Sequence, residues 1–151
     1  MVDEADRRIL RALQSNPNLT MRELGEKTGL SHTPCWRRLK KMQDDGVIKD
    51  KRYVLNAEAL GFEIVVFCFV RMKEHTREKL VDFEQAALRL PVVLQCYSVT
   101  GDYDYILRVL ARNMKEYEQT IKDSLVELPH VSFINTSVTL NEVKNTTNLP
   151  I

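Results

Sequence analysis

Hydrophobic residues in the first 46 positions recur at helical spacing in three short stretches. Asp3 can cap a first helix that carries Ile9, Leu10 and Leu13 on one side. The stretch Asn16–Asn18 ends this helix, because its proline disfavours helical backbone in the residue before it. The pattern therefore predicts an amphipathic helix at the start of the chain.

Two further helices follow the first. Thr20 and Glu23 form a capping box, in which each side chain accepts a hydrogen bond from the other residue's free amide. Gly29 permits the positive φ of a tight turn, Ser31 caps the third helix, and Gly46 with the aspartate before it ends that helix. Two helices joined by a short turn containing glycine are typical of a helix-turn-helix unit.

The third helix has one apolar face and one polar face. At about 100° per residue, Cys35, Leu39 and Met42 share a stripe. A DNA recognition helix needs this arrangement, because its first residues meet base edges while Lys and Arg reach phosphates. Arg37 is the candidate guanine contact, since its guanidinium is forked. The alternative is a solvated charged surface that binds nothing. The side chains of this region expected at DNA are Ser31, His32, Thr33, Trp36, Arg37, Arg38, Lys40 and Lys41.

The next stretch, 47–55, is expected to form a small hairpin or wing. Lys49, Lys51 and Arg52 add three cations there, and we place Lys51 and Arg52 at the DNA as well. Residues 31–52 hold 7 Lys and Arg against 3 Asp and Glu, a local net charge of +4 in a chain of net charge +1. Such clustering favours a polyanion, because binding releases counterions from the phosphates.

From residue 63 the pattern alternates between strands and helices. Apolar or alternating runs predict strands at 64–70, 92–100, 105–111 and 131–140, and helical spacing predicts helices at 76–90 and after Asn113. The order β-α-β-β-α-β is that of a ferredoxin-like domain. We therefore expect an α+β protein with a winged helix-turn-helix domain at 1–55, a linker at 56–62, and a ferredoxin-like domain at 63–151.

The first predicted strand is apolar on both faces. Val65, Phe67 and Phe69 lie on one face, and Val66 and Cys68 lie on the other. Two helices cover only one face of a four-stranded sheet, so one of these sets would be exposed to water. We expect a dimer in which two such sheets pack face to face. The alternative is that the N-terminal domain covers the free face.

Composition sets the class of the protein. Of the 151 residues, 44% are hydrophobic and 28% are charged, which suits a folded chain with a core. The sequence shows no basic leader followed by an apolar stretch and no long apolar run, so we expect a cytoplasmic protein that does not enter a membrane. Cys35, Cys68 and Cys96 are widely spaced, as is typical of reduced thiols.

Catalysis is not indicated by any constellation of residues. His32, His75 and His130 are scattered, and His32 with Cys35 would give a metal only two ligands. Two carboxylates on one turn, Asp102 and Asp104, are commonplace and point weakly to a hard cation. We expect no enzymatic activity, no metal and no cofactor.

Five stretches together resemble the Lrp/AsnC, or feast/famine, family of transcriptional regulators of bacteria and archaea. The resemblance covers nearly the whole chain. Residues 33–40 and 145–151 are most similar to a branch of cysteine-responsive activators of cysteine detoxification. The five stretches are Asp6–Gln14, Leu30–Leu39, Gly46–Ile48, Thr100–Tyr105 and Glu142–Lys144.

This resemblance implies a regulator of amino-acid metabolism that binds double-stranded DNA at the nucleoid and responds to a free amino acid. It also implies homodimers that assemble further, often into octameric rings of four dimers, with the effector between dimers. The residues implied at the effector are Val99, Thr100, Gly101, Asp102, Tyr103 and Asp104, with Thr136 and Ser137 on the last strand.

The chemistry of the stretch 99–104 agrees with that implication. Gly101 lets the backbone approach a ligand closely, and free amides beside it can hold an α-carboxylate. Asp102 or Asp104 can hold an α-ammonium group. Three alternatives stay open: an ordinary hairpin turn, an architectural DNA-binding protein without an effector, and an amino-acid sensor without a role at DNA.

Overall fold

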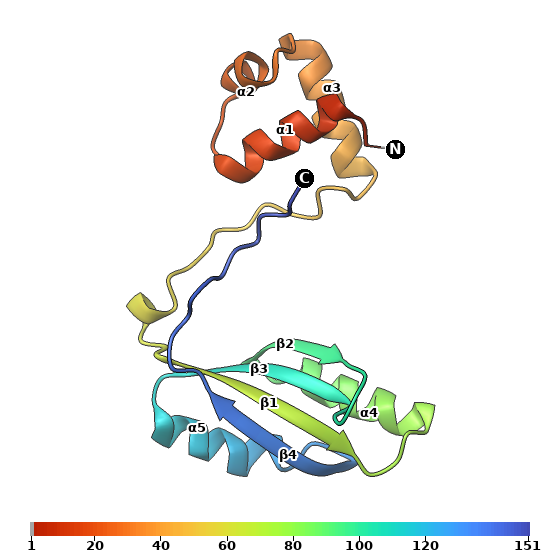
Figure 1. The fold of residues 1–151 in the computed structure, drawn as a ribbon, viewed down its shortest axis with the longest axis vertical. Helices are drawn as coiled ribbons and strands as arrows, with labels where there is room; N and C mark the ends of the chain where they lie inside the picture. Colours follow the sequence, from red (N-terminus) through yellow and green to blue (C-terminus); the bar gives the residue numbers. More distant parts are fainter. Residues whose placement is uncertain (1) are drawn as a thin grey trace. The chain divides into compact units, whose positions relative to one another are not determined.

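The computed structural model describes residues 2–151, which form two compact units (Figure 1). One unit consists of the chain up to Val54 together with Lys144–Ile151, and the other is Leu55–Val143. The sequence placed 144–151 with the second domain, whereas the structure groups this segment with the first. The reason is that three hydrogen bonds tie the segment to the first helix.

The first unit contains the three expected helices. They are α1 (Glu4–Ser15), α2 (Met21–Thr28) and α3 (His32–Asp44). Ile9 of α1, Leu24 of α2, and Cys35 and Met42 of α3 are buried together and form one small core. The predicted apolar stripe of α3 is therefore the face by which this helix packs.

The predicted helix caps are largely confirmed. Asp3 and Asp6 form a capping box at the start of α1, and Thr20 and Glu23 form one at the start of α2. Gly29 has a φ of 69°, the left-handed conformation that the tight turn requires. Ser31 occupies the cap position of α3 with extended backbone, but its side chain makes no capping hydrogen bond.

The hairpin expected over 47–55 does not form. After Gly46 this stretch contains no strand and runs to the 3-10 turn Glu58–Leu60. Asp50 accepts hydrogen bonds from the Lys51 amide and the Arg52 side chain, so it organises its neighbours locally. A stretch with charges at 49–52 and no turn-forming glycine or asparagine lacks the residues that close a tight hairpin.

The second unit has the predicted β-α-β-β-α-β order. The elements are β1 (Ile64–Met72), α4 (Arg77–Leu88), β2 (Val93–Ser98), β3 (Tyr105–Ala111), α5 (Met114–Thr120) with a π-helical turn at Ile121–Leu125, and β4 (Val131–Val138). The four strands form one sheet in the order β2-β3-β1-β4, and all neighbours are antiparallel.

Both helices of this unit pack on the same face of the sheet. Cys68 of β1 and Leu107 of β3, a cross-strand pair, are buried in one cluster with Phe83 of α4 and Tyr117 of α5. The residues between them point the other way. On that open face lie Val65, Phe67, Phe69, Tyr97, Ile106 and Phe133.

The open face carries these apolar side chains together with polar ones such as Arg71 and Arg108, and it is partly exposed. Tyr97 and Phe133 are each more than half exposed, and Phe67 is 36% exposed. The sequence-based expectation that one side of β1 lacks a covering helix is therefore met within the second unit.

Candidate DNA-binding surface and effector-binding loop

The start of α3 presents a row of exposed side chains. Ser31, His32, Thr33, Trp36 and Arg37 are all exposed. Trp36 is 52% exposed although it is the largest apolar residue of the unit. Within residues 2–151, the Arg37 guanidinium has no hydrogen-bond or ion-pair partner. This part of the predicted interface therefore has side chains available to a ligand.

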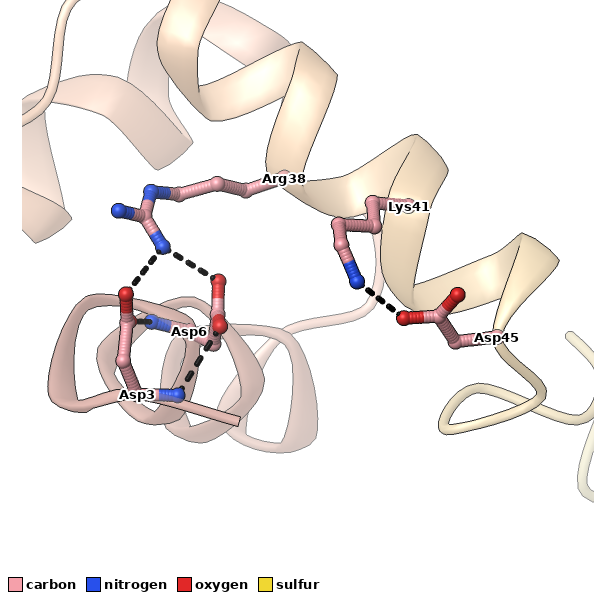
Figure 2. A network of polar contacts seen from close by, with 5 residues as sticks. All are labelled: Asp3, Asp6, Arg38, Lys41 and Asp45. Carbon is pink, nitrogen blue, oxygen red and sulfur yellow. Dashed lines mark hydrogen bonds and ion pairs between the residues drawn. The ribbon is translucent and has the colours of Figure 1, made fainter. Parts of the chain in front are cut away.

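Arg38 faces a different direction from Arg37. Its guanidinium donates hydrogen bonds to Asp3, at 2.7 Å, and to Asp6, at 2.9 Å, and so ties α3 to α1 (Figure 2). The Asp6 amide and the Arg38 guanidinium hold the pKa of Asp3 below its ordinary value. The hydrogen bonds that the Arg38 guanidinium donates to the Asp3 and Asp6 carboxylates raise the pKa of Arg38. Arg38 was expected at DNA, and the structure gives it a structural contact in addition.

The last two cations of α3 each form an ion pair with an aspartate one turn later in the chain. Lys40 contacts Asp44 at 3.1 Å, and Lys41 pairs with Asp45 (Figure 2). Both lysines are exposed, and such pairs are weak and easily exchanged for a phosphate.

The cations after α3 are equally accessible. Lys51 is exposed, and Arg52 is paired with Asp50 at 2.7 Å. They lie on an extended segment rather than on the expected hairpin. Their placement beside α3 on DNA stays a prediction.

The β2–β3 turn is the predicted effector-binding loop, Val99–Asp104. Two backbone hydrogen bonds of 2.9 Å close it, from the Val99 amide to the Asp104 carbonyl and from the Asp104 amide to the Val70 carbonyl. Gly101 has a φ of 110°, which side-chain-bearing residues rarely adopt, and nothing lies within 4 Å of the position of a Cβ. The loop is therefore shaped by backbone conformation and opens to solvent at Gly101.

The two aspartates of the loop differ in their surroundings. Asp104 accepts hydrogen bonds from the Met72 amide, at 2.7 Å, and from the His75 ring, at 2.8 Å. Burial opposes the ionisation of Asp104, but these two donors outweigh it and hold its pKa below the ordinary value. Asp102 is exposed. Asp104 therefore anchors the loop, and Asp102 is the carboxylate available to a ligand.

Tyr103 within the loop and Arg71 on β1 hold the loop against the sheet. The Tyr103 ring lies 5.3 Å from the Phe69 ring, and its hydroxyl accepts a hydrogen bond from Asn135 on β4. The Arg71 guanidinium lies 5.6 Å from the Tyr103 ring centre and donates a 3.0 Å hydrogen bond to the Asp102 carbonyl. The β1–β4 register shifts between Arg71 and Met72, and such bulges re-aim side chains beside functional sites.

Sequence reasoning missed Arg71, His75 and Asn135. Arg71 carried a signal, because it is the one charge in the β1 stretch 64–72 and alternation places it on the face of Phe67 and Phe69. His75 and Asn135 carried none, since their contacts join residues 29 and 32 positions apart.

Thr136 and Ser137 lie on opposite faces of the sheet. Thr136 is paired with Cys68, on the helix-covered side, and Ser137 is paired with Phe67, on the open side. Within residues 2–151 it is their neighbour Asn135 that contacts the loop. One protomer therefore does not bring all of the expected effector residues together.

The remaining chemical groups give no sign of a metal or of a reactive thiol. Across residues 2–151, no group of three His, Cys, Asp or Glu side chains is placed to hold a metal ion. Cys35, Cys68 and Cys96 are free thiols. Burial raises the pKa of Cys68, which makes its thiol a poor nucleophile. No helix within residues 2–151 is long and apolar enough to span a bilayer.

A helix-turn-helix unit with exposed side chains at the start of α3, joined to a βαββαβ sheet unit, is the architecture of a DNA-binding transcriptional regulator with a separate ligand-binding domain. Family comparisons agree. Residues 2–49 match the winged helix-turn-helix DNA-binding family, and residues 65–149 match the Lrp/AsnC ligand binding domain. The chain belongs to the Lrp/AsnC family of transcriptional regulators.

Individual relatives match over nearly their whole length. The DNA-binding transcriptional activator DecR of Escherichia coli K12 is 34% identical over all of this chain and 99% of DecR. The glutamate uptake regulatory protein of Zymomonas mobilis is 38% identical, over 99% of this chain and 91% of that protein.

Two crystal structures share the fold. An AsnC family transcriptional regulator from Agrobacterium tumefaciens has a TM-score of 0.93 and 34% identity, over 98% of this chain and 96% of that one. The regulator NMB0573 from Neisseria meningitidis, in complex with L-Met, has a TM-score of 0.93 and 33% identity, over 99% of this chain and 97% of that one.

Proposed function

We propose that this protein regulates genes of amino-acid metabolism by reading double-stranded DNA with the start of α3 and by binding a free amino acid at the loop Val99–Asp104. The observation that carries the proposal is that Arg38 of α3 makes structural contacts whereas Arg37 of the same helix is free to contact a ligand. Arg38 ties this helix to α1, while Arg37 and Trp36 are exposed, and the Arg37 guanidinium has no hydrogen-bond or ion-pair partner within residues 2–151. An exposed arginine beside an exposed aromatic residue, on a helix held in place by other contacts, is the arrangement by which a recognition helix contacts base edges in the major groove.

An amino-acid effector requires one group for its ammonium and another for its carboxylate. The exposed Asp102 carboxylate suits the ammonium. Arg71 suits the carboxylate, because its Nε is fixed on the Asp102 carbonyl and its ring contact with Tyr103 orients the guanidinium at the loop. The regulator NMB0573, described in complex with L-Met, supports the amino-acid class of the effector.

We propose that the open face of the sheet packs against the same face of a second copy. Its apolar side chains include Phe67, Tyr97 and Phe133, and a self-complementary patch of this kind favours a two-fold dimer. Thr136 and Ser137 point to different sides of the sheet, which supports an effector site completed by another protomer. Dimers would then assemble further, into an octamer, and the protein would act at the nucleoid.

The test is a salt-dependent gel shift on a DNA fragment from upstream of the protein's own gene. Arg37→Ala should weaken binding, and Arg8→Ala, which removes an equally exposed arginine from α1, should leave it unchanged. Equal binding by the protein and by Arg37→Ala would remove α3 from the interface.

An architectural DNA-binding protein without an effector is the second candidate. It is favoured by the placement of Thr136 and Ser137 on opposite faces of the sheet, because they do not line one site together within a protomer. Thermal-shift measurements with each standard amino acid separate the two functions. An effector present at about 100 times its Kd should stabilise the folded protein by about 2.7 kcal/mol, whereas an architectural protein should respond to none.

A further inference from the structure

The last residues of the chain attach to the DNA-binding unit. The Gln14 side chain of α1 accepts a hydrogen bond from the Leu149 amide, at 2.6 Å, and donates one to the Leu149 carbonyl, at 3.2 Å. Arg11, one turn earlier, donates to the Ile151 carbonyl at 2.7 Å. Gln14 therefore pairs with the main chain of Leu149 in both directions, as a neighbouring strand would.

Polar contacts hold this segment, which is exposed except at the partly buried Ile151. Leu149 is 66% exposed, and the segment 144–151 forms no helix or strand. The Arg11 guanidinium is already oriented by Glu4, at 2.8 Å, so it is held ready for the Ile151 carbonyl. A segment attached by a few exposed hydrogen bonds can detach and rebind without unfolding the helices beneath it.

The attachment has a topological consequence. The effector-binding unit, Leu55–Val143, lies in sequence between the two stretches that build the DNA-binding unit. The DNA-binding unit is thus connected to it twice, after Val54 and before Lys144. A second connection restricts how far and in which direction the DNA-binding unit can turn.

The second connection also has a firm base. Thr139, directly after β4, donates from both its amide and its hydroxyl to the Val65 carbonyl of β1, at 2.9 and 3.0 Å. Glu142 lies 3.8 Å from Arg108 of β3. The chain therefore leaves the sheet through contacts with β1 and β3, so a change in the sheet reaches the start of Lys144–Ile151 directly.

A path continues from the attachment to α3. The segment holds the last turn of α1, and the first turn of α1 holds α3 through Asp3, Asp6 and Arg38 (Figure 2). We propose that Lys144–Ile151 is a regulatory strap, whose docking on Gln14 and Arg11 transmits the effector-bound state of the sheet to the recognition helix. The proposal rests on the proposed function, because it assigns the route by which the effector changes DNA binding.

Such a strap regulates only if its docking differs between the free and the effector-bound protein. The coupling is measured as the ratio of the DNA Kd without and with amino acid, with L-methionine tested first and then the other standard amino acids. In the unaltered protein we expect this ratio to depart from one by roughly 5-fold or more, in either direction.

Gln14→Ala removes both hydrogen bonds to Leu149, and Leu149→Pro removes the amide from the strap side without altering α1. Both variants should bring the ratio close to one while the affinities for DNA alone and for the amino acid alone are retained. Ser15→Ala is the matched control, because Ser15 is exposed on the same turn and its hydroxyl donates to the Ala12 carbonyl, with no contact to the strap within residues 2–151. Its ratio should equal that of the unaltered protein.

Hydrogen exchange at the Leu149 amide shows whether the strap has detached in each variant that retains this amide, and limited proteolysis shows it in Leu149→Pro. A detached strap with an unchanged ratio overturns the strap and leaves the proposed function standing. An unaltered protein that fails to bind DNA, or that binds no amino acid, overturns the proposed function and the strap with it. A Gln14→Ala protein that does not fold leaves the decision to Leu149→Pro.

Discussion

Arg38 on α3 donates a 2.9 Å hydrogen bond to the carboxylate of Asp6 on α1. Asp6 is only 8% exposed. The other oxygen of that carboxylate accepts the Asp3 amide at 3.1 Å, so one aspartate completes a helix cap and also joins two helices. The position of α3 against α1 therefore depends in part on Arg38, a cation that the sequence pattern assigns to DNA.

Replacing Arg38 should destabilise the first unit. In Arg38→Met, Asp6 loses its cation, and the free energy of unfolding in urea should fall by clearly more than in a variant that breaks an exposed ion pair, because a largely buried carboxylate is left without a hydrogen-bond donor. Lys40→Met is the matched control, because the exposed Lys40–Asp44 pair should contribute at most about 0.5 kcal/mol. Equal stability losses in the two variants would show that the Asp6 contact does not brace α3.

Replacing Arg37 should leave the stability unchanged and weaken DNA binding. Arg37→Ala should leave the unfolding free energy unchanged within about 0.5 kcal/mol, since the side chain is exposed and unpaired within residues 2–151. It should weaken DNA binding by roughly 10-fold to 100-fold, the cost of a lost bidentate base contact. Fluorescence anisotropy on specific and scrambled DNA checks this, and a loss of the same size on both would reduce Arg37 to a phosphate contact.

Gly101 should control the effector response. In Gly101→Ala the φ of 110° becomes strained by roughly 1–3 kcal/mol, so the loop should adopt another shape although space for a Cβ exists. The rise in Tm on addition of the effector should then disappear, while DNA affinity without effector is retained. Calorimetry that finds the same amino-acid affinity in both proteins would place the effector elsewhere.

Asp104 should make the second unit sensitive to acid. Its lowered pKa means that the folded state favours the ionised carboxylate. The resulting stabilisation is present in full above the ordinary value of 3.8 and is lost as the pH falls below that value through the folded pKa. The unfolding free energies of the protein and of Asp104→Asn should thus differ at neutral pH and converge below about pH 4. A difference that does not change with pH would show that the charge of Asp104 contributes nothing.

The open sheet face should determine the oligomeric state. Tyr97→Glu and Phe133→Glu place charges on that face, and across a two-fold axis each charge would be buried without a partner. Sedimentation should show a smaller assembly than that of the unaltered protein. Leu88→Glu is the control, because Leu88 is 75% exposed on α4 and lies outside the face. Dissociation by the control alone would move the interface to the helical side.

Local sequence signals predicted most of the fold because they depend on near neighbours. The capping pairs Asp3–Asp6 and Thr20–Glu23 lie three residues apart, and the alternation along β1 fixes which side chains share a face. The prediction of a hairpin at 47–55 was wrong because it rested on clustered charges. Such clustering indicates an electrostatic surface but carries no information about strand pairing.

The sequence by itself therefore determined the helices, the strands, their order, the polar face of α3 and the loop at Gly101, because periodicity, capping and turn chemistry act within a few residues. Only the tertiary structure decided how the cations of α3 divide between structure and surface, which aspartate of the loop is engaged, and where residues 144–151 attach. These outcomes depend on side chains up to 140 positions apart that meet only when the chain is folded, and no local pattern encodes such meetings.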